Sequence, residues 1–313
     1  MLRSSPLHLV LALAAVGCTR AEEEPWTADE EAPPLVDEVS FSPPPDDAIR
    51  LQRVLSDGDE ATYSIRLGYQ VRMRGHLMPA TVTDLTDQLV VMCRTSSTDG
   101  EHGFLAATVE SADTSMDPAV EGVDDEIEAR FRDAAIRSPA TTRSAWSQPV
   151  SPPRPGAPAA RDMSVQEREL AEAMRRLVPD LAGGPVEVGD EWPFEATMRR
   201  ALPGGRQVVL SLAGRYRFVG MTEREDRTLA AVDLDYEVNA AGASERDGIA
   251  GDVSGRGVGR GLFLVEPSTG TTMRSQVVET THIVLRLAEN RRRLDAEQLT
   301  RLTFDLSMIE GTP

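Results

Sequence analysis

Hydrophobic and polar residues alternate with a period of two along much of this chain. Between residues 62 and 73 every second residue is Tyr, Ile, Leu, Val or Met, and most of the residues between them are polar. Residues 207–219, 232–238 and 302–308 repeat the pattern. Because successive side chains of a β-strand point to opposite faces of a sheet, the alternation predicts long strands with one apolar face. We predict further strands at about 82–94, 103–111, 257–266 and 271–287, and a turn at 186–192 that leads into a strand.

Two segments have the spacing of amphipathic helices instead. Residues 124–137 begin with acidic residues and end with arginine, which suits the dipole of a helix. Residues 164–177 open on a capping box formed by Ser164 and Glu167. Since the strands follow one another without a helix between each pair, we predict an α+β fold. It would be a long-stranded, curved, mostly antiparallel sheet or open barrel with two helices on one side. A hairpin turn is expected at 267–270 and a short helical turn near 295–299.

The N-terminus has a different pattern. An apolar run from Leu7 to Val16 follows Arg3; it is too short to span a bilayer, which takes about 20 residues, and has the length of a secretory signal core. Its end, Ala15-Val16-Gly17-Cys18, resembles the lipobox of bacterial lipoproteins. The resemblance implies that residues 1–17 are a signal peptide and that Cys18 is the lipid attachment site. An ordinary cleavable signal peptide with an incidental cysteine is the alternative.

Lipidation at Cys18 would anchor the protein to a membrane of the bacterial cell envelope. Thr19 in the next position resembles an address for the outer membrane. Residues 18–48 are acidic and rich in proline, with ten acidic residues and one basic residue between positions 20 and 47. This composition predicts a disordered linker. Residues 49–313 would form the β-rich domain, with a mobile loop at about 138–163 that is rich in Pro, Ser, Ala and Arg.

The net charge of the chain limits which partners it can bind, and its cysteine content limits its thiol chemistry. The formal net charge of −18 repels phosphate backbones, so nucleic acid is excluded as a partner. If Cys18 carries lipid, Cys93 has no cysteine left to pair with. Cys93 lies in an apolar strand pattern, which favours a buried, inert thiol over a reactive one.

No residue pattern indicates catalysis or a cofactor. His76, His102 and His282 are far apart and have no metal-ligand spacing. The glycine-rich stretch at 255–261 precedes a strand, so it is no phosphate loop, and its glycines indicate a bulge or a close approach between strands. The alternating acidic residues of 233–237 are those of a solvated strand face. We therefore predict a protein that is not an enzyme, with no catalytic residue, no cofactor and no metal site.

The layout resembles uncharacterised bacterial lipoproteins through Val188-Gly189-Asp190-Glu191-Trp192 and the later hairpin at Glu266–Gly270. A looser likeness is to periplasmic lipoprotein carriers, in which a curved sheet and helices enclose an apolar cavity. Two functions remain open. The first is binding of a lipid or other hydrophobic ligand in a curved-sheet cavity. The alternative is a structural or protein-interaction module of the envelope with a packed core, using the loop at 138–163 as a contact.

Overall fold

Long antiparallel strands make up most of the computed structural model of this chain. It describes residues 41, 48–75, 78–97, 99–117, 131, 133–146, 149–150, 163–202, 206–246, 249–289 and 292–309. The strands are β1 (Ile49–Leu51), β2 (Glu60–Gly75), β3 (Met78–Ser97), β4 (His102–Asp117), β5 (Ala135–Thr141), β6 (Gly184–Val186), β7 (Glu191–Leu202), β8 (Arg206–Arg224), β9 (Arg227–Arg246), β10 (Ile249–Glu266), β11 (Thr271–Glu289) and β12 (Arg292–Ile309), and the helix is α3 (Val165–Leu177).

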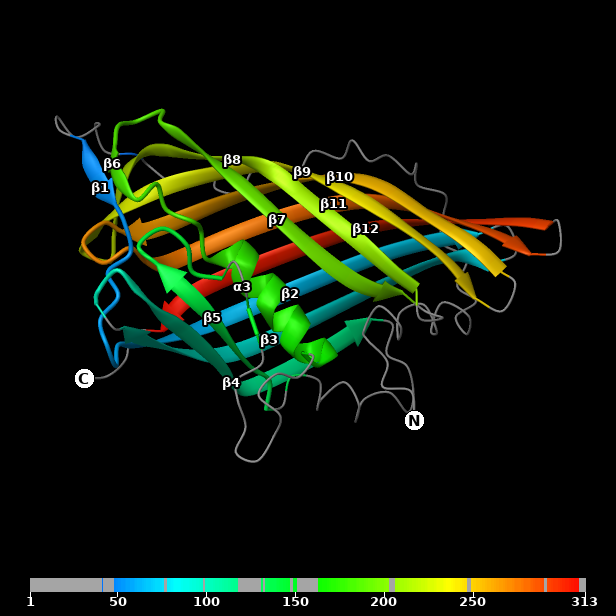
Figure 1. The fold of residues 1–313 in the computed structure, drawn as a ribbon, viewed down its shortest axis with the longest axis horizontal. Helices are drawn as coiled ribbons and strands as arrows, with labels where there is room; N and C mark the ends of the chain where they lie inside the picture. The colour runs from blue at the N-terminus through cyan, green and yellow to red at the C-terminus, as the bar shows by residue number, and fades with distance from the viewer. Residues whose placement is uncertain are drawn as a thin grey trace.

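Ten of the strands form a single antiparallel sheet (Figure 1). Its order is β5-β4-β3-β2-β12-β11-β10-β9-β8-β7. Strands β2 to β5 form one run of neighbouring strands, and β7 to β12 form a second run. The two runs join where β12 pairs with β2. The predicted turn at 267–270 connects β10 to β11. The sheet is open, with β5 and β7 as its two edge strands.

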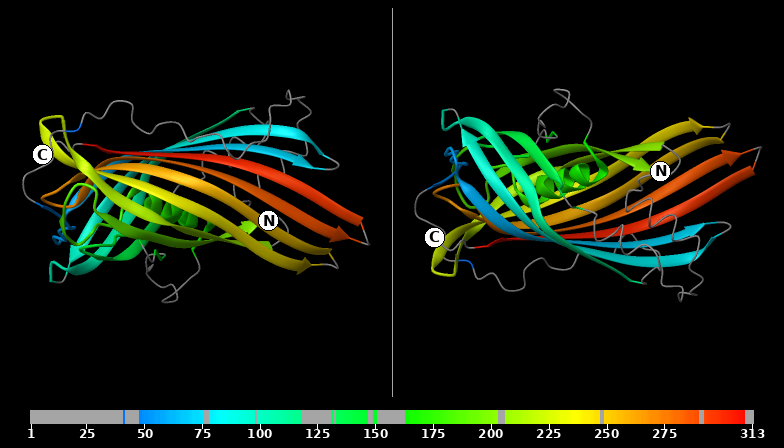
Figure 2. Two further views of the ribbon diagram at one scale, coloured as in Figure 1. Left: turned by 90° about the horizontal axis from the view of Figure 1, so that it is seen from above. Right: turned by 90° about the horizontal axis from the view of Figure 1, so that it is seen from below.

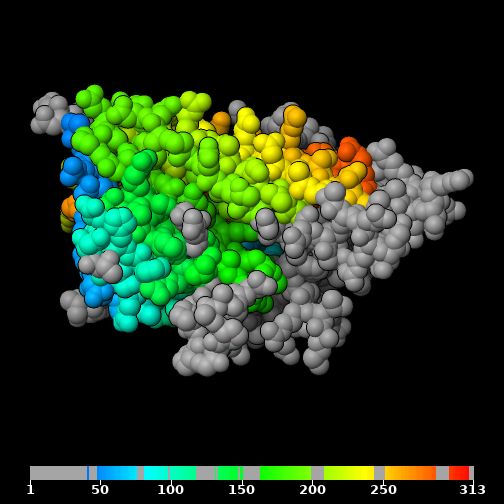
Figure 3. Space-filling view, in the orientation of Figure 1, coloured from blue at the N-terminus to red at the C-terminus, as the bar shows by residue number. Residues whose placement is uncertain are grey.

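The sheet curves around α3, which lies on its concave face (Figures 1 and 2). The helix contacts β5, β11 and β12. In the space-filling view from the same side, side chains of the helix and its neighbouring segments fill the concave face of the sheet around α3 (Figure 3). A short pairing of β1 with β6 forms a separate two-stranded sheet.

The alternation in the sequence decides which side chains form the core. On β2 the apolar side of the strand, from Tyr63 to Met73, faces inward and most of it is buried, while its polar side faces outward. On β9 the residues from Val232 to Val238 divide in the same way. The helix adds Leu170, Met174 and Leu177, which are fully buried. The inward strand faces and the apolar side of α3 therefore form one main hydrophobic core.

The prediction of an α+β fold with two helices is wrong. The protein is nearly all β, and α3 is the one helix in the described part of the chain. Of the predicted helix at 124–137, residues 124–130 lie outside the described ranges, whereas Ala135–Arg137 begin strand β5. Ile136, Ser138 and Ala140 are buried, and the residues between them are less buried. Pairing with β4 therefore outweighs the helical spacing of the sequence. Pro139 is tolerated because β5 is an edge strand.

Two further boundaries differ from the prediction. Residues 295–299, expected as a helical turn, belong to strand β12 and pair with β2 and β11. The segment predicted as a loop at 138–163 begins as strand β5 through Thr141, and its Val150 forms an isolated bridge with Arg137. Cys18 and the signal peptide, together with nearly all of the predicted linker, lie outside the described residues.

Candidate functional site

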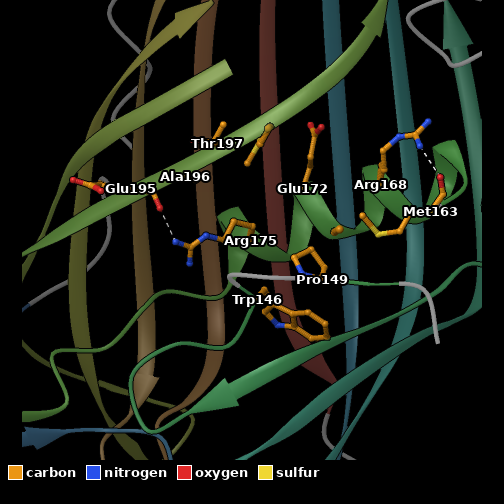
Figure 4. A pocket seen from close by; sticks show the side chains of 11 residues that line it. Trp146, Pro149, Met163, Arg168, Glu172, Arg175, Glu195, Ala196 and Thr197 are labelled. Carbon is orange, nitrogen blue, oxygen red and sulfur yellow. Dashed lines mark hydrogen bonds between the residues drawn. The ribbon is translucent and has the colours of Figure 1, made fainter. Parts of the chain in front are cut away.

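A cleft lies between α3 and the edge strand β7. Its volume is about 430 Å³, which falls in the range of small-molecule sites. The helix supplies one wall, β7 the other, and the segment before the helix supplies the floor (Figure 4). The lining residues are Trp146, Pro149, Met163, Arg168, Ala171, Glu172, Arg175, Glu195, Ala196, Thr197 and Met198.

Local sequence fixes the helix that forms one wall. The Ser164 hydroxyl accepts a hydrogen bond from the Glu167 backbone N–H at 3.1 Å, and the Ser164 N–H donates to the Glu167 carboxylate at 2.7 Å. This is the predicted capping box, so the start of α3 is confirmed. At the other end Arg175 donates to the Asp180 carboxylate and to the main-chain carbonyl of Glu195, each at 2.8 Å. Arg175 therefore ties the helix directly to the free edge of β7.

A buried ion pair fixes the depth of the helix on the sheet. Arg176 on α3 donates to Glu279 on β11 through Nε at 3.0 Å, and Nη2 lies 2.9 Å from the same oxygen. The Tyr236 hydroxyl donates to that oxygen at 2.9 Å, and the Arg176 guanidinium also contacts the sulfur of Met198 at 3.1 Å. Met198 lines the cleft, so the pair fixes part of the β7 wall as well.

Burial and charge shift the pKa values of this network in definite directions. Burial lowers the pKa of Arg176, but the charges of Glu279, Tyr236 and Glu172 together with the hydrogen bond to Glu279 outweigh it, so the pKa is raised. Burial, followed by the Glu279 charge, raises the pKa of Tyr236 well above its ordinary value. Arg176 therefore stays charged and Tyr236 stays a neutral hydrogen-bond donor, so the network is suited to holding the fold and has no group poised to exchange protons.

A second buried arginine secures the end of the sheet near β1. Arg53 donates to the carbonyl oxygens of Gly270 and Pro179, each at 3.2 Å. Desolvation lowers the pKa of Arg53. Its partners are main-chain carbonyls of the β10–β11 turn and of the segment after α3, so it joins these two elements and lies outside the cleft.

The cleft itself combines apolar walls with a charged rim. Met163, Ala171 and Met198 present carbon and sulfur, whereas Arg168, Glu172 and Arg175 place charges around them. No histidine or cysteine lines the cleft, and the described residues contain no group of three or more His, Cys, Asp and Glu able to hold a metal ion. The arrangement suits binding of an apolar group better than nucleophilic or metal chemistry.

The residues considered from sequence fall in different places. Cys93 is buried, as predicted, and burial raises its pKa to about 12. His282 is partly exposed on the outer face, with Nε2 3.7 Å from the Glu297 carboxylate. His102 is exposed beside Asp99, while His76 and Cys18 lie outside the described residues.

The acidic stripe of β9 is confirmed as a solvent-facing strand surface. Asp233 pairs with Arg217 at 2.9 Å and Asp235 with Arg260 at 3.3 Å, all four side chains being substantially exposed. The glycine-rich stretch lies within β10, where the register is regular. The glycines of residues 255–261 therefore mark no bulge. They do mark a close approach between strands, because a Cβ at Gly259 would overlap the Tyr236 ring.

Sequence reasoning missed the cleft. Trp146 and Pro149 lie in the segment predicted as a mobile loop, yet Trp146 is 1% exposed and belongs to the main core. A tryptophan within a long Pro- and Ser-rich segment was the available signal that the segment packs against the domain. The helix packs directly on the sheet, and the cleft lies open beside it.

Comparisons with known proteins give little support for an assignment. No protein family and no curated protein matches the sequence. Among solved structures, Pseudomonas aeruginosa OccK2 matches with 8% identity and a TM-score of 0.23, over 83% of this chain and 100% of the other. The outer membrane protein OmpT of Vibrio cholerae, as a loop-deletion mutant, matches with 7% identity and a TM-score of 0.22, over 80% and 100%. TM-scores this low establish neither a shared fold nor a shared function. In the described part of the chain no helix is long and apolar enough to cross a membrane.

Proposed function

We propose that this chain is a membrane-anchored, non-enzymatic protein of the bacterial cell envelope that binds a hydrophobic ligand in the cleft between α3 and β7. The observation that carries the proposal is the cleft of about 430 Å³ with methionine and alanine side chains on its walls. Its walls are fixed by buried contacts of Arg175 and Arg176. A preformed site of this kind binds an apolar group without a large ordering cost.

Filling the cleft tests the binding proposal. The probe is N-phenyl-1-naphthylamine, a neutral dye whose fluorescence rises in apolar surroundings, added to the full mature chain carrying Cys18→Ser. Ala196→Trp places an indole in the cleft and is expected to weaken dye binding at least tenfold. Ala241→Trp is the matched control, because Ala241 is exposed on β9 away from the cleft, and it is expected to bind the dye like the parent.

Equal dye binding by both tryptophan variants and the parent would show that the cleft is not the site. Absence of dye binding by the parent would leave the structural or protein-interaction module as the better explanation. Thermal unfolding of each variant separates loss of the site from loss of the fold. Native mass spectrometry of the parent, purified from its own envelope, then identifies what the cleft retains.

The anchor is tested separately. Cys18→Ser is expected to release the protein from the membrane fraction, since each buried CH₂ of an acyl chain contributes about 0.8 kcal/mol. The measurement is ultracentrifugation of cell lysates followed by immunoblotting. A Cys18→Ser protein that still pellets with outer membranes would contradict lipid anchoring at this residue, and the lipid-free form should retain dye binding.

A further inference from the structure

Among the described residues that line the cleft, Arg168 is the cation for which the structure shows no acidic partner. It lies on the second turn of α3, and its Nη1 donates to the Met163 carbonyl at 2.6 Å (Figure 4). No carboxylate of the described residues forms an ion pair with it. Its side chain is half-buried at the cleft wall. A partly desolvated guanidinium bound only to a carbonyl retains hydrogen-bond donors and a full charge for an anion.

The other charged side chains at the rim of the cleft either form ion pairs or point away from the helix side chains. Arg175 pairs with Asp180 at 2.8 Å, and Glu172 lies 3.8 Å from Arg176. The Glu195 carboxylate points away from the helix side chains, although its carbonyl faces Arg175 (Figure 4). Among the described lining residues, an anion entering the cleft therefore meets one positive charge without an ion pair, at the end where Met163 begins the apolar wall.

The charge of the whole chain sharpens this contrast. With a net charge of −18, the protein repels anions at long range. An anionic group therefore binds only where nearby hydrogen-bond donors and positive charge outweigh this repulsion. Arginine offers a planar fork that matches the oxygens of a carboxylate or phosphate. Arg168 combines this chemistry with adjacent apolar walls.

We propose that the cleft is specific for anionic amphiphiles: single hydrocarbon chains that carry a carboxylate or phosphate. The head group binds the guanidinium of Arg168, and the chain lies along Met163, Ala171 and Met198. This inference rests on the proposed function and names its ligand class. A carboxylate head corresponds to a fatty acid and a phosphate head to a phospholipid-like molecule, and the two share the same recognition chemistry.

The test compares two probes that share one dansyl-labelled hydrocarbon chain and differ in whether the head group carries a negative charge. These are 11-(dansylamino)undecanoic acid and its methyl ester, titrated into the mature chain carrying Cys18→Ser, below the probes' aggregation limit. The acid is expected to bind at least tenfold more tightly than the ester. Arg168→Gln is expected to abolish that preference by weakening binding of the acid at least tenfold, whereas Arg168→Lys keeps part of it. Arg286→Gln, on the exposed outer face of β11, is the matched control and keeps the preference.

Competition distinguishes the sources of the head group. The competitors are dodecanoate, monododecyl phosphate and dodecanol, and each displaces the dansyl probe according to its affinity. The anion that binds more tightly identifies the preferred head group as a carboxylate or a phosphate. Each pair of methylenes removed is expected to weaken an anion about tenfold, at about 0.8 kcal/mol per CH₂. Inorganic phosphate alone is expected not to compete.

Each contrary result has a distinct meaning. Equal binding of acid and ester would overturn the role of Arg168 and leave the hydrophobic cleft intact. Competition by inorganic phosphate would indicate a free-anion site and overturn the amphiphile. Failure of every probe, including the neutral naphthylamine dye, would overturn the proposed function and this inference together.

Discussion

Replacing Glu279 with leucine is expected to lower the free energy of unfolding by about 3–5 kcal/mol, because it leaves a buried guanidinium without its carboxylate. The side chains of Arg176 and Glu279 are 0% and 1% exposed, so water cannot take the place of the lost partner. The Tyr236 hydroxyl also loses its acceptor. The measurement is equilibrium unfolding in urea, followed by circular dichroism.

The double variant Arg176→Met with Glu279→Leu is expected to recover most of the lost stability. Replacing a complete buried pair by apolar residues is often neutral or stabilising, since both desolvation costs disappear together. Glu191→Leu is the matched control: it breaks the Arg215–Glu191 pair, whose side chains are 67% and 42% exposed, and is expected to cost less than about 1 kcal/mol. A loss at Glu279 no larger than the loss at Glu191 would show that the pair does not anchor the helix.

Binding adds a second readout to the same variants. Arg176 contacts Met198 on the cleft wall, and its pair with Glu279 fixes the depth of α3. Glu279→Leu is therefore expected to weaken binding of the naphthylamine dye even at temperatures where the protein remains folded. The double variant restores stability without restoring the Arg176–Met198 contact, so stability and binding should separate there.

Alternating patterns predicted the strands correctly because one face of each strand is buried. The inward face of β9, from Val232 to Val238, can be identified from the sequence without knowledge of the partner strands. The helix at 164–177 was predictable for a similar reason: Ser164 and Glu167 satisfy its first backbone donors locally. Such features depend on residues that lie close together in the sequence.

The rest depends on contacts between distant residues. Strand β5 at Ala135–Thr141 carries an arginine, a serine and a proline, and only pairing with β4 shows that its alternate residues are buried. The ion pair joins residues 103 positions apart. Its signal was a glutamate at 279 on the same strand face as Val277, a core position where a charge is stable only with a buried partner.

The cleft was unpredictable for the same reason. Its floor comes from Trp146 and Pro149, its walls from α3 and β7, and no periodic pattern connects them. The chemistry of Arg168 also depends on geometry. In sequence it is one arginine among 33 basic residues. It becomes distinct because, among the described residues, it lies beside apolar walls and has no ion-pair partner.

Gly259→Ala is expected to destabilise the protein by about 3 kcal/mol, combining overpacking with loss of a buried hydrogen bond. A Cβ at this position would overlap the ring of Tyr236, which lies in the core beside Phe194 at a centroid distance of 5.3 Å. The ring can yield only by moving its hydroxyl away from Glu279. Gly184→Ala is the matched control, because no heavy atom lies within 4 Å of its added Cβ, and it is expected to be neutral or stabilising.

A double-mutant cycle assigns the cost to the overlap. In a Tyr236→Leu background the ring is gone, so the added methyl of Gly259→Ala should cost far less, and the two changes should couple by more than about 1 kcal/mol. Additive effects would mean that the glycine is required by the backbone of β10 and not by the tyrosine. Coupling would show that Gly259 makes room for Tyr236, whose hydroxyl completes the Arg176–Glu279 anchor and thereby fixes one wall of the cleft.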